Sequence, residues 1–209
     1  MADKKRLRGQ EGFLGGGAPP EEYGIGGCID VETTGLSPRY NEIIEFALIL
    51  FSYHRPTGEI IAVLDEYSGL REPGCAISRG AAGVHGLTRE QLRGKTLAQE
   101  RIADMLQRAD FILSHNANFD YNFVVPLFPW AAAKPWYCSM NGIDWRSKGF
   151  ASKGLQRLLA WHGVEIDRAH RALDDAKALL ALLALNSKGG QSYLGELLKS
   201  TPIPSGSTP

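Results

Sequence analysis

Two carboxylates stand at the end of an apolar stretch near the start of the chain. Asp30 and Glu32 lie in the segment Ile29 to Leu36, which reads as a strand that ends in a glycine-containing turn. Alternate side chains of a strand face the same way, so both carboxylates project to one side, with Cα atoms roughly 6.6 Å apart. Carboxylate oxygens are the ligands that hard cations such as Mg²⁺ prefer. The segment therefore predicts a site for a hard cation.

Two later fragments supply what such a site would still need. The segment His115 to Asp120 reads His-Asn-Ala-Asn-Phe-Asp, and the segment His170 to Asp175 reads His-Arg-Ala-Leu-Asp-Asp. Hydrolysis of a phosphodiester by two divalent ions, roughly 3.5–4 Å apart, requires such spaced carboxylates. Any single one of them could be a surface or capping residue. Asp30 argues against that reading for the set, because it lies inside an apolar strand, where an unpaired charge is costly.

These fragments, in this order and at this spacing, resemble the motifs of the DEDDh branch of the DnaQ-like 3′→5′ exonucleases. The epsilon proofreading subunit of bacterial DNA polymerase III typifies that branch. The first motif, Asp-x-Glu-Thr, matches Asp30 to Thr33, and the second supplies Asp120. The third motif, His-x-Ala-x-x-Asp, matches His170 to Asp175, and Val84 to Thr88 looks like the family's Val-His-Gly-Ile-Thr segment. The resemblance covers roughly residues 26–185.

The resemblance implies a metal-dependent 3′→5′ exonuclease that releases nucleoside 5′-monophosphates from single-stranded or frayed 3′ ends. DNA is favoured over RNA, with a role in DNA proofreading or repair. The expected cofactors are two Mg²⁺ or Mn²⁺ ions. An RNA-trimming exoribonuclease and a non-catalytic adaptor for a DNA polymerase or sliding clamp are the alternatives, although the repulsive cluster argues against an adaptor. The expected metal ligands are Asp30, Glu32, Asp120 and Asp175.

His170 is the expected general base, because an imidazole with a reference pKa of about 6.5 can accept a proton from a polarised water near neutral pH. The sister branch of the family has Tyr one position later, where this chain has Arg171. On an ideal helix His170 and Asp175 lie about 140° apart, whereas His170 and Asp174 share a face. The family pattern favours Asp175. We therefore expect His170 before the regular helix, and Asp174 as a carboxylate of the helix N-terminus.

Substrate contacts follow from the resemblance. Leu36 resembles an apolar residue that wedges against the terminal base, and Phe119 resembles an aromatic residue that packs on the same nucleotide; a core role is the alternative for each. Thr33 and the backbone after Glu32 are expected to hold the terminal 3′ hydroxyl. His85 is expected to shape a loop beside the pocket. The remaining expectation is a network of His115 and Asn116 where a helix begins.

Alternating strands and helices must position these residues. Periodicity and turn residues predict an α/β fold, a ribonuclease-H-like mixed five-stranded sheet flanked by helices. A capping box is expected at 96–99 and a helix cap at Ser152. The expected strands are residues 26–33, 42–53, 59–67, 110–114 and 136–140. Four helices are expected: one that follows residue 96, one that begins at Asn116 or Asn118, one from Ser152 to Gly163, and one over about 169–185.

Three parts are expected along the chain. Glycines and prolines interrupt every apolar period in residues 1–24, which predicts a flexible arm. Residues 25–187 are expected to form one exonuclease domain, and residues 188–209 a C-terminal tail. Within the tail, 188–194 resembles the Gly-Gly-Gln stretch by which the proofreading subunit binds the sliding clamp, but Gly195 and Glu196 depart from that pattern. The sequence leaves open whether the tail docks on the domain or on a partner.

Charge and cysteine content limit the function classes. Among the 209 residues, 23 Lys and Arg balance 23 Asp and Glu, so no overall basic field exists to hold long duplex nucleic acid. The balance is compatible with an enzyme that grips a few nucleotides of a single strand at its 3′ end. Three cysteines without a Cys-x-x-Cys pair argue against a disulfide framework and a structural zinc site. We therefore expect a cytoplasmic protein with neither a signal peptide nor a membrane span.

Overall fold

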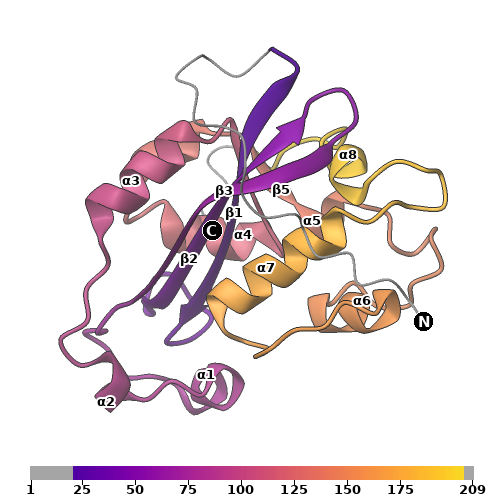
Figure 1. Ribbon diagram of the computed structural model, residues 1–209. Coiled ribbons are helices and arrows are strands. Elements are labelled where there is room, and N and C mark those ends of the chain that lie inside the picture. The colour runs from indigo at the N-terminus through magenta and orange to yellow at the C-terminus, as the bar shows by residue number, and fades with distance from the viewer. Residues whose placement is uncertain (1–20, 205–209) are drawn as a thin grey trace.

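The computed structural model describes residues 21–204, which form a five-stranded mixed sheet with flanking helices (Figure 1). The sheet order is β3-β2-β1-β4-β5. Strands β1 (Tyr23–Thr33), β2 (Ile43–His54) and β3 (Glu59–Leu70) form an antiparallel meander. Strands β4 (Phe111–Ser114) and β5 (Trp136–Cys138) continue the sheet parallel to β1. The expected fold class is confirmed.

Strand β1 begins at Tyr23, inside the segment expected to be a flexible arm; residues 1–20 of that segment lie outside the described residues. Glycines let this strand lie close to aromatic side chains of its neighbours. A Cβ atom at Gly26 would overlap the ring of Phe51 on β2. The glycines that weaken the apolar pattern at residues 24–27 therefore belong to the sheet, because their missing side chains leave room for rings.

Two layers of helices cover the two faces of the sheet. Helices α3 (Gln99–Arg108) and α4 (Ala117–Val124) pack on the face that presents Ile29, Phe46 and Leu48. The opposite face, with Cys28, Ile49 and Phe51, packs against α6, α7 and α8. These three helices are Leu155–His162, Ala172–Leu183 and Tyr193–Leu197. Figure 1 shows α7 lying alongside β1 and β2.

Shorter helices complete the described fold. Helices α1 (Arg79–His85) and α2 (Arg89–Leu92) lie together at one end of the sheet (Figure 1) and pack through Leu87 and Leu92 on Ile44. A 3-10 helix, η1 (Pro129–Ala133), precedes β5, and α5 (Ser139–Gly142) follows it.

Two expected helix caps are wrong. Helix α3 has Ala98 at its N-cap position without a side-chain cap, and the backbone N–H of Gln99, which Thr96 was expected to cap, donates to the Leu97 carbonyl at 2.9 Å. The reciprocal capping box of this region belongs to Thr88 and Gln91 at the start of α2. Helix α6 begins after Gly154 rather than Ser152, although Gly163 ends it in the left-handed conformation as expected. The Ala98 N–H donates to the Tyr67 hydroxyl at 2.8 Å, so a tertiary contact orients the chain where α3 begins, and the Ser152 hydroxyl accepts from the Gly154 N–H at 3.2 Å, just before α6.

The segment expected to be a tail is packed into the domain as far as Pro204. Leu194 and Leu197 of α8 are fully buried, and the Ser192 hydroxyl donates to the Gly58 carbonyl at 2.9 Å. The backbone N–H of Ile203 donates to the Trp136 carbonyl at 2.8 Å. A Cβ atom at Gly58, where φ is 69°, would overlap the backbone of Gly195. Close packing against the β2–β3 turn therefore explains a glycine that departs from the clamp-binding pattern.

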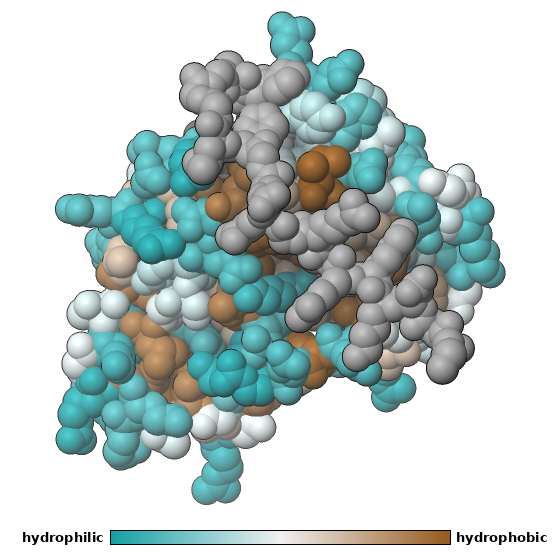
Figure 2. All heavy atoms as spheres, in the orientation of Figure 1, coloured by the Kyte–Doolittle hydropathy of each residue, from teal (hydrophilic) through white to brown (hydrophobic). Residues whose placement is uncertain are grey.

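Apolar side chains reach the surface in separate patches. On the face shown in Figure 2, hydrophobic patches lie between hydrophilic residues rather than in one band. Leu36 and Tyr40, in the loop after β1, are the most exposed of the large apolar residues described, at 85% and 68%. Across residues 21–204 we find no helix with the length and apolar composition that crossing a membrane requires. The three cysteines are free, and Cys28 and Cys138 are buried.

Candidate active site

The sequence motifs meet in an open cleft at the carboxyl end of β1. The cleft has a volume of ≈ 370 Å³. Strand β1 contributes one wall, the start of α4 a second, and the chain before α6 and α7 a third. The residues that line the cleft are Asp30, Val31, Glu32, His115, Phe119, Asp120, Gly154, Leu155, Gln156, Arg157, His170 and Asp175. All five residues expected to act in catalysis are in this set.

Four carboxylates lie close together in the cleft. Glu32, His170 and Asp175 offer ligand atoms within 4.8 Å of one another. Asp30 is half-buried and Asp120 is only 2% exposed, and the charge of Asp120 acts on both Asp30 and Glu32. No salt bridge among the described residues involves any of the four. Within the described part of the chain, the cluster therefore has no cationic side chain in a salt bridge with it to balance its carboxylates when they are ionised.

The pKa values of the cluster show the cost of this arrangement. Burial, followed by repulsion from Asp120, Asp175 and Glu32, raises the pKa of Asp30 well above its ordinary value. Burial and neighbouring carboxylates raise the pKa of Glu32 to about 8. Burial raises the pKa of Asp120 to about 7, against the opposing effect of the Ser114 hydroxyl and backbone N–H groups. A bound cation would remove this repulsion, so the donor set fits a hard divalent metal.

Asp175 reaches the cleft from the first turn of α7. Its two oxygens accept hydrogen bonds from the Gln156 side-chain amide at 2.9 Å and from the backbone N–H of His170 at 3.0 Å. His170 precedes the helix, in a turn with a φ of 62°, so helical angles do not apply to it, as expected. Asp174 points elsewhere and accepts from Arg168 Nε at 3.0 Å. The geometry therefore groups Asp175, not Asp174, with Glu32 and His170.

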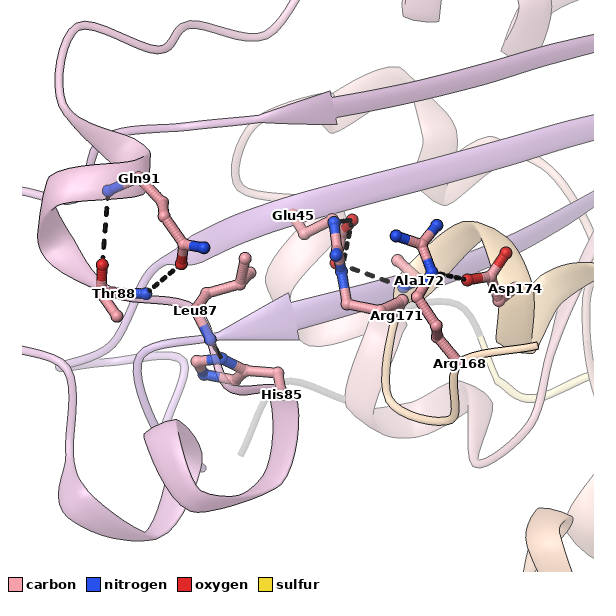
Figure 3. A network of polar contacts seen from close by, with 9 residues as sticks. All are labelled: Glu45, His85, Leu87, Thr88, Gln91, Arg168, Arg171, Ala172 and Asp174. Atoms are coloured by element: carbon pink, nitrogen blue, oxygen red, sulfur yellow. Dashed lines mark hydrogen bonds and ion pairs between the residues drawn. The ribbon is translucent and has the colours of Figure 1, made fainter. Parts of the chain in front are cut away.

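The sequence analysis missed Glu45 of β2. Glu45 lies directly opposite Glu32 in the sheet, is 2% exposed, and pairs with Arg171 (Figure 3). Its signal was available, because it is a lone charge within the apolar segment 43–51. Gln156 was missed as well; nothing in its helical pattern marks it as a partner of Asp175.

One of the residues expected to contact substrate lines the cleft, and three others lie outside it. Phe119 lines the cleft, with its ring centroid 4.9 Å from that of Phe123. Leu36 is almost fully exposed, and the Thr33 hydroxyl donates to the Gly35 carbonyl at 2.7 Å. Asn116 is exposed in a left-handed conformation before α4. Of these four, only Phe119 is part of the cleft wall.

His85 is buried at the end of α1, outside the set that lines the cleft. Its Nδ1 accepts from the backbone N–H of Leu87 at 2.9 Å (Figure 3), so the neutral ring carries its proton on Nε2. Burial lowers the pKa of His85. The ring therefore helps to fix the turn between α1 and α2, and the expected role of His85 beside the substrate pocket stays a prediction.

His115 forms a different network from the one expected with Asn116. Its ring nitrogens lie 2.9 Å from the Ser139 hydroxyl and 2.8 Å from the Lys153 carbonyl. Burial lowers the pKa of His115 to about 4, so the ring is neutral at physiological pH. A neutral ring with both nitrogens engaged connects α5 to the chain before α6. His115 thus holds the third wall of the cleft in place.

Comparison with known proteins is consistent with this site. The exonuclease family model RNase_T matches residues 28–183. A PolC-type DNA polymerase III from Thermotoga petrophila is 32% identical over 193 residues, covering 83% of this chain and 13% of that protein. The chain therefore spans a small part of the length of the curated relatives it matches.

Solved structures share the fold. Exonuclease I of E. coli, in complex with a dT13 oligonucleotide, has a TM-score of 0.63 at 19% identity, over 76% of this chain and 40% of that one. A 3′-exonuclease that recognises the 3′ end of a histone mRNA stem-loop has a TM-score of 0.58 at 21% identity, over 76% and 62% of the two chains. The family model matches well over half of the sequence, including every carboxylate of the cleft. The chain belongs to the exonuclease family.

Proposed function

We propose that this chain is a metal-dependent 3′→5′ exonuclease that hydrolyses single-stranded or frayed DNA ends. The observation that carries the proposal is the cluster of four carboxylates, unpaired by any salt bridge of the described residues, beside His170 in an open cleft. A binding module would gain nothing from a cluster that raises the pKa values of its own carboxylates. The cluster is what a cation-assisted hydrolase needs.

Asp30, Glu32, Asp120 and Asp175 would hold two Mg²⁺ or Mn²⁺ ions. When bound, two such ions activate an attacking water and stabilise the leaving 3′ oxygen. The raised pKa values also mean that ion binding displaces protons from these carboxylates. Metal occupancy should therefore strengthen as the pH rises.

His170 is the proposed general base. Its imidazole is exposed to the cleft and lies beside Glu32 and Asp175, where it can take a proton from the attacking water. The backbone N–H of His170 is fixed on Asp175, so the ring and the carboxylate keep a constant relation. This arrangement places the proton acceptor at the open side of the carboxylate cluster.

The terminal nucleotide would occupy the space between Phe119 and the carboxylates. Stacking on the Phe119 ring tolerates any base, as an exonuclease without sequence preference requires. Leu36, in the exposed loop after β1, would wedge against the terminal base. Thr33 and Asn116 would contribute backbone contacts, since the Thr33 hydroxyl is already used internally. His85 would act through the shape of its turn.

The phosphate backbone would lie near Arg157. Among the described residues, Arg157 is the one Lys or Arg side chain that lines the cleft, and it has no ion-pair partner there. It is exposed and faces a wall of carboxylates. A cation on this side can hold a phosphate whose charge the cluster would otherwise repel.

The relatives support a proposal for the natural setting of this activity. PolC-type polymerases align with this chain over a short part of their length. Proofreading or repair of DNA, in contact with a polymerase or a sliding clamp, is the setting we propose. An RNA 3′ end is the rival substrate, because one structural neighbour recognises an mRNA stem-loop. The two substrates differ at the 2′-hydroxyl.

The test is product analysis on matched 5′-labelled DNA and RNA single strands. We expect a ladder that shortens from the 3′ end of DNA with Mg²⁺ or Mn²⁺, no products in EDTA, and no rescue by Ca²⁺, whose looser geometry misplaces the water. A strand with a blocked 3′ terminus should resist. Equal activity in EDTA would refute the mechanism, cleavage of circular strands would show an endonuclease, and faster RNA degradation would reassign the substrate.

A further inference from the structure

The turn that carries His170 is attached to the sheet by an ion pair. Arg171 Nε lies 3.0 Å from Glu45 Oε2 and 3.2 Å from Oε1, and Arg171 Nη2 lies 2.8 Å from Oε1 (Figure 3). The same carboxylate accepts from the backbone N–H of Ala172, the first residue of α7, at 3.3 Å. Both oxygens of a nearly fully buried side chain are thus engaged. Bidentate geometry of this kind fixes orientation as well as distance.

The residue next to this pair has a strained backbone. His170 has a φ of 62°, and a left-handed conformation costs an ordinary L-residue roughly 1–2 kcal/mol. Such a conformation persists only where the surroundings over-determine it. Contacts hold the turn on each side: the His170 N–H donates to Asp175 at 3.0 Å, and Arg171 is anchored on Glu45.

The pair also keeps a fifth carboxylate out of the metal site. Glu45 lies opposite Glu32 on the face of the sheet that α7 covers, and its charge contributes to the raised pKa values of Asp30 and Glu32. Since both of its oxygens bind Arg171, it is not available as a ligand. Arg171 in turn does not line the cleft, and its Nε and Nη2 are committed to Glu45. Neither partner is placed to touch substrate.

We propose that Glu45 and Arg171 are positioning residues for His170. The pair holds the turn in the left-handed conformation that brings the imidazole beside Glu32 and Asp175. The inference rests on the proposed function, in which His170 is the general base. A displacement of about 1 Å in a reacting group can cost about 100-fold in rate, so the positioning role predicts a loss in turnover rather than in binding.

The test is a double-mutant comparison built on the paired variant Glu45→Gln with Arg171→Met. Removing both charges avoids a lone buried ion, and the Gln carbonyl still accepts from Ala172. We expect kcat to fall by about 10- to 100-fold, while KM for a short DNA strand and the Mn²⁺ affinity change by less than about twofold. In a His170→Ala background the same pair of changes should alter kcat by less than about twofold, because no imidazole is left to position.

Two controls separate positioning from general loss of structure. The surface pair Asp65 and Arg101, 3.0 Å apart on β3 and α3, offers the matched variant Asp65→Asn with Arg101→Met, which should leave kcat unchanged. If the Glu45 and Arg171 variant does not fold, Arg171→Lys keeps the charge but loses the bidentate contact. It should lower kcat by several-fold at constant KM in the parent background and not in the His170→Ala background.

The outcomes are distinct. Equal losses with and without His170 would overturn the positioning role, as would an unchanged kcat in the folded paired variant. If His170→Ala alone left turnover unchanged, the base assignment and the positioning role would both fall. Metal-dependent degradation by the unmutated protein would still stand in each case, so failure of the inference and failure of the proposed function can be told apart.

Discussion

The two sides of the cleft are held in different ways. On the strand side, Asp30 and Glu32 take their positions from the backbone ladder of β1, in register with Ala47 and Glu45 of β2. On the loop side, Asp175 takes its position from the first turn of α7, and His170 lies in the turn before that helix, which is held by Asp175 and by the ion pair of Arg171. The strand side is therefore held by a backbone ladder, whereas the turn of His170 keeps its place only as long as its polar contacts persist.

This difference matches the proposed roles. Groups that must tolerate mutual repulsion need a support that the repulsion cannot deform, and central strands provide it. A proton acceptor needs access to water, which an exposed turn provides, but it also needs a fixed direction. The polar contacts of the loop side supply that direction. Substitutions of the carboxylates should therefore change charge balance and metal binding, whereas substitutions in the turn of His170 should change turnover without changing metal binding.

The largest effect is expected from Asp30→Asn on the strand side. The change keeps the shape and removes the charge of a proposed metal ligand, so activity should fall by about 10⁴-fold or more, equivalent to several kcal/mol of transition-state stabilisation. The metal-free protein should be more stable, because the repulsion that raises the pKa of Asp30 is relieved. Steady-state kinetics and thermal melts in EDTA measure both effects. A lower melting temperature would show that Asp30 is a structural residue.

On the loop side, His170→Ala should slow turnover by about 10²–10⁴-fold, the usual contribution of a general base. Mn²⁺ affinity should stay within about twofold of the parent, since the four carboxylates are untouched. Metal titration monitored by calorimetry, together with kcat, separates the two effects. A loss of metal affinity as large as that of Asp30→Asn would make His170 a ligand and remove the distinction between the two sides.

The strand side could be predicted from the sequence, and the support of the loop side could not. Alternation along one strand is enough to place Asp30 and Glu32 on one face. The family pattern, together with the angle between His170 and Asp175 on an ideal helix, predicted His170 outside α7, where the structure has it. The partner of Arg171, by contrast, is Glu45, 126 residues away in sequence. Local periodicity carries no information on such a pairing.

The same limit explains the errors in the fold. The cap expected at residues 96–99 fits a local pattern, but the structure has Ala98 at the N-cap position, where its N–H donates to the Tyr67 hydroxyl, 31 residues away in sequence. Residues 194–198 form a short amphipathic segment whose pattern does not show where it docks, and in the structure α8 is held by burial of Leu194 and Leu197 in the layer that covers the sheet. Structural elements that depend on residues distant in sequence cannot be predicted from local patterns, because those patterns do not show which distant residues they will contact.

The pH dependence of stability tests the charge balance of the carboxylate cluster, which spans β1, α4 and α7. The pKa of Glu32 is raised from 4.5 to about 8 and that of Asp120 from 3.8 to about 7. Carboxyl groups with raised pKa values in the folded state stabilise the fold fully only below their ordinary pKa values, and this stability is lost as the pH rises through the folded values. The melting temperature of the metal-free protein should therefore fall between about pH 5 and pH 8.

Mn²⁺ should oppose that fall, raising the melting temperature more at pH 8 than at pH 6, because at pH 6 it competes with bound protons. Asp120→Asn should flatten the metal-free profile, whereas Asp65→Asn on the outer strand should not. If the melting temperature of the metal-free protein rose from pH 5 to pH 8, the raised pKa values of Glu32 and Asp120 would be contradicted.

A smaller effect is expected at the wall formed by α6, where Arg157→Ala should raise KM for a DNA strand by up to about fivefold and leave kcat unchanged. Exposed ion pairs contribute about 0.2–1 kcal/mol, and the contribution should fade with salt. Arg146→Ala, an exposed arginine outside the cleft, is the matched control. Initial rates at several salt concentrations measure the effect, and a fall in kcat would assign Arg157 to the chemical step.

The smallest effect is expected from Asp174→Ala, which distinguishes two adjacent carboxylates of the loop side. Asp174 pairs with the exposed Arg168 at 3.0 Å and lies in the first turn of α7, whereas Asp175 points into the cleft. Asp174→Ala should cost up to about 1 kcal/mol of stability, the value of a carboxylate near a helix N-terminus, and change turnover by less than about twofold.

Asp175→Ala should instead weaken metal binding and turnover together. It removes a proposed ligand. It also removes the acceptor of the hydrogen bond that the backbone N–H of His170 donates to Asp175. Parallel urea melts, Mn²⁺ titrations and kinetics of the two variants give the comparison. If Asp174→Ala abolished metal binding and Asp175→Ala remained active, His170 and its ligand would share a helical face after all, and the turn before α7 would have to re-form as helix when metal binds.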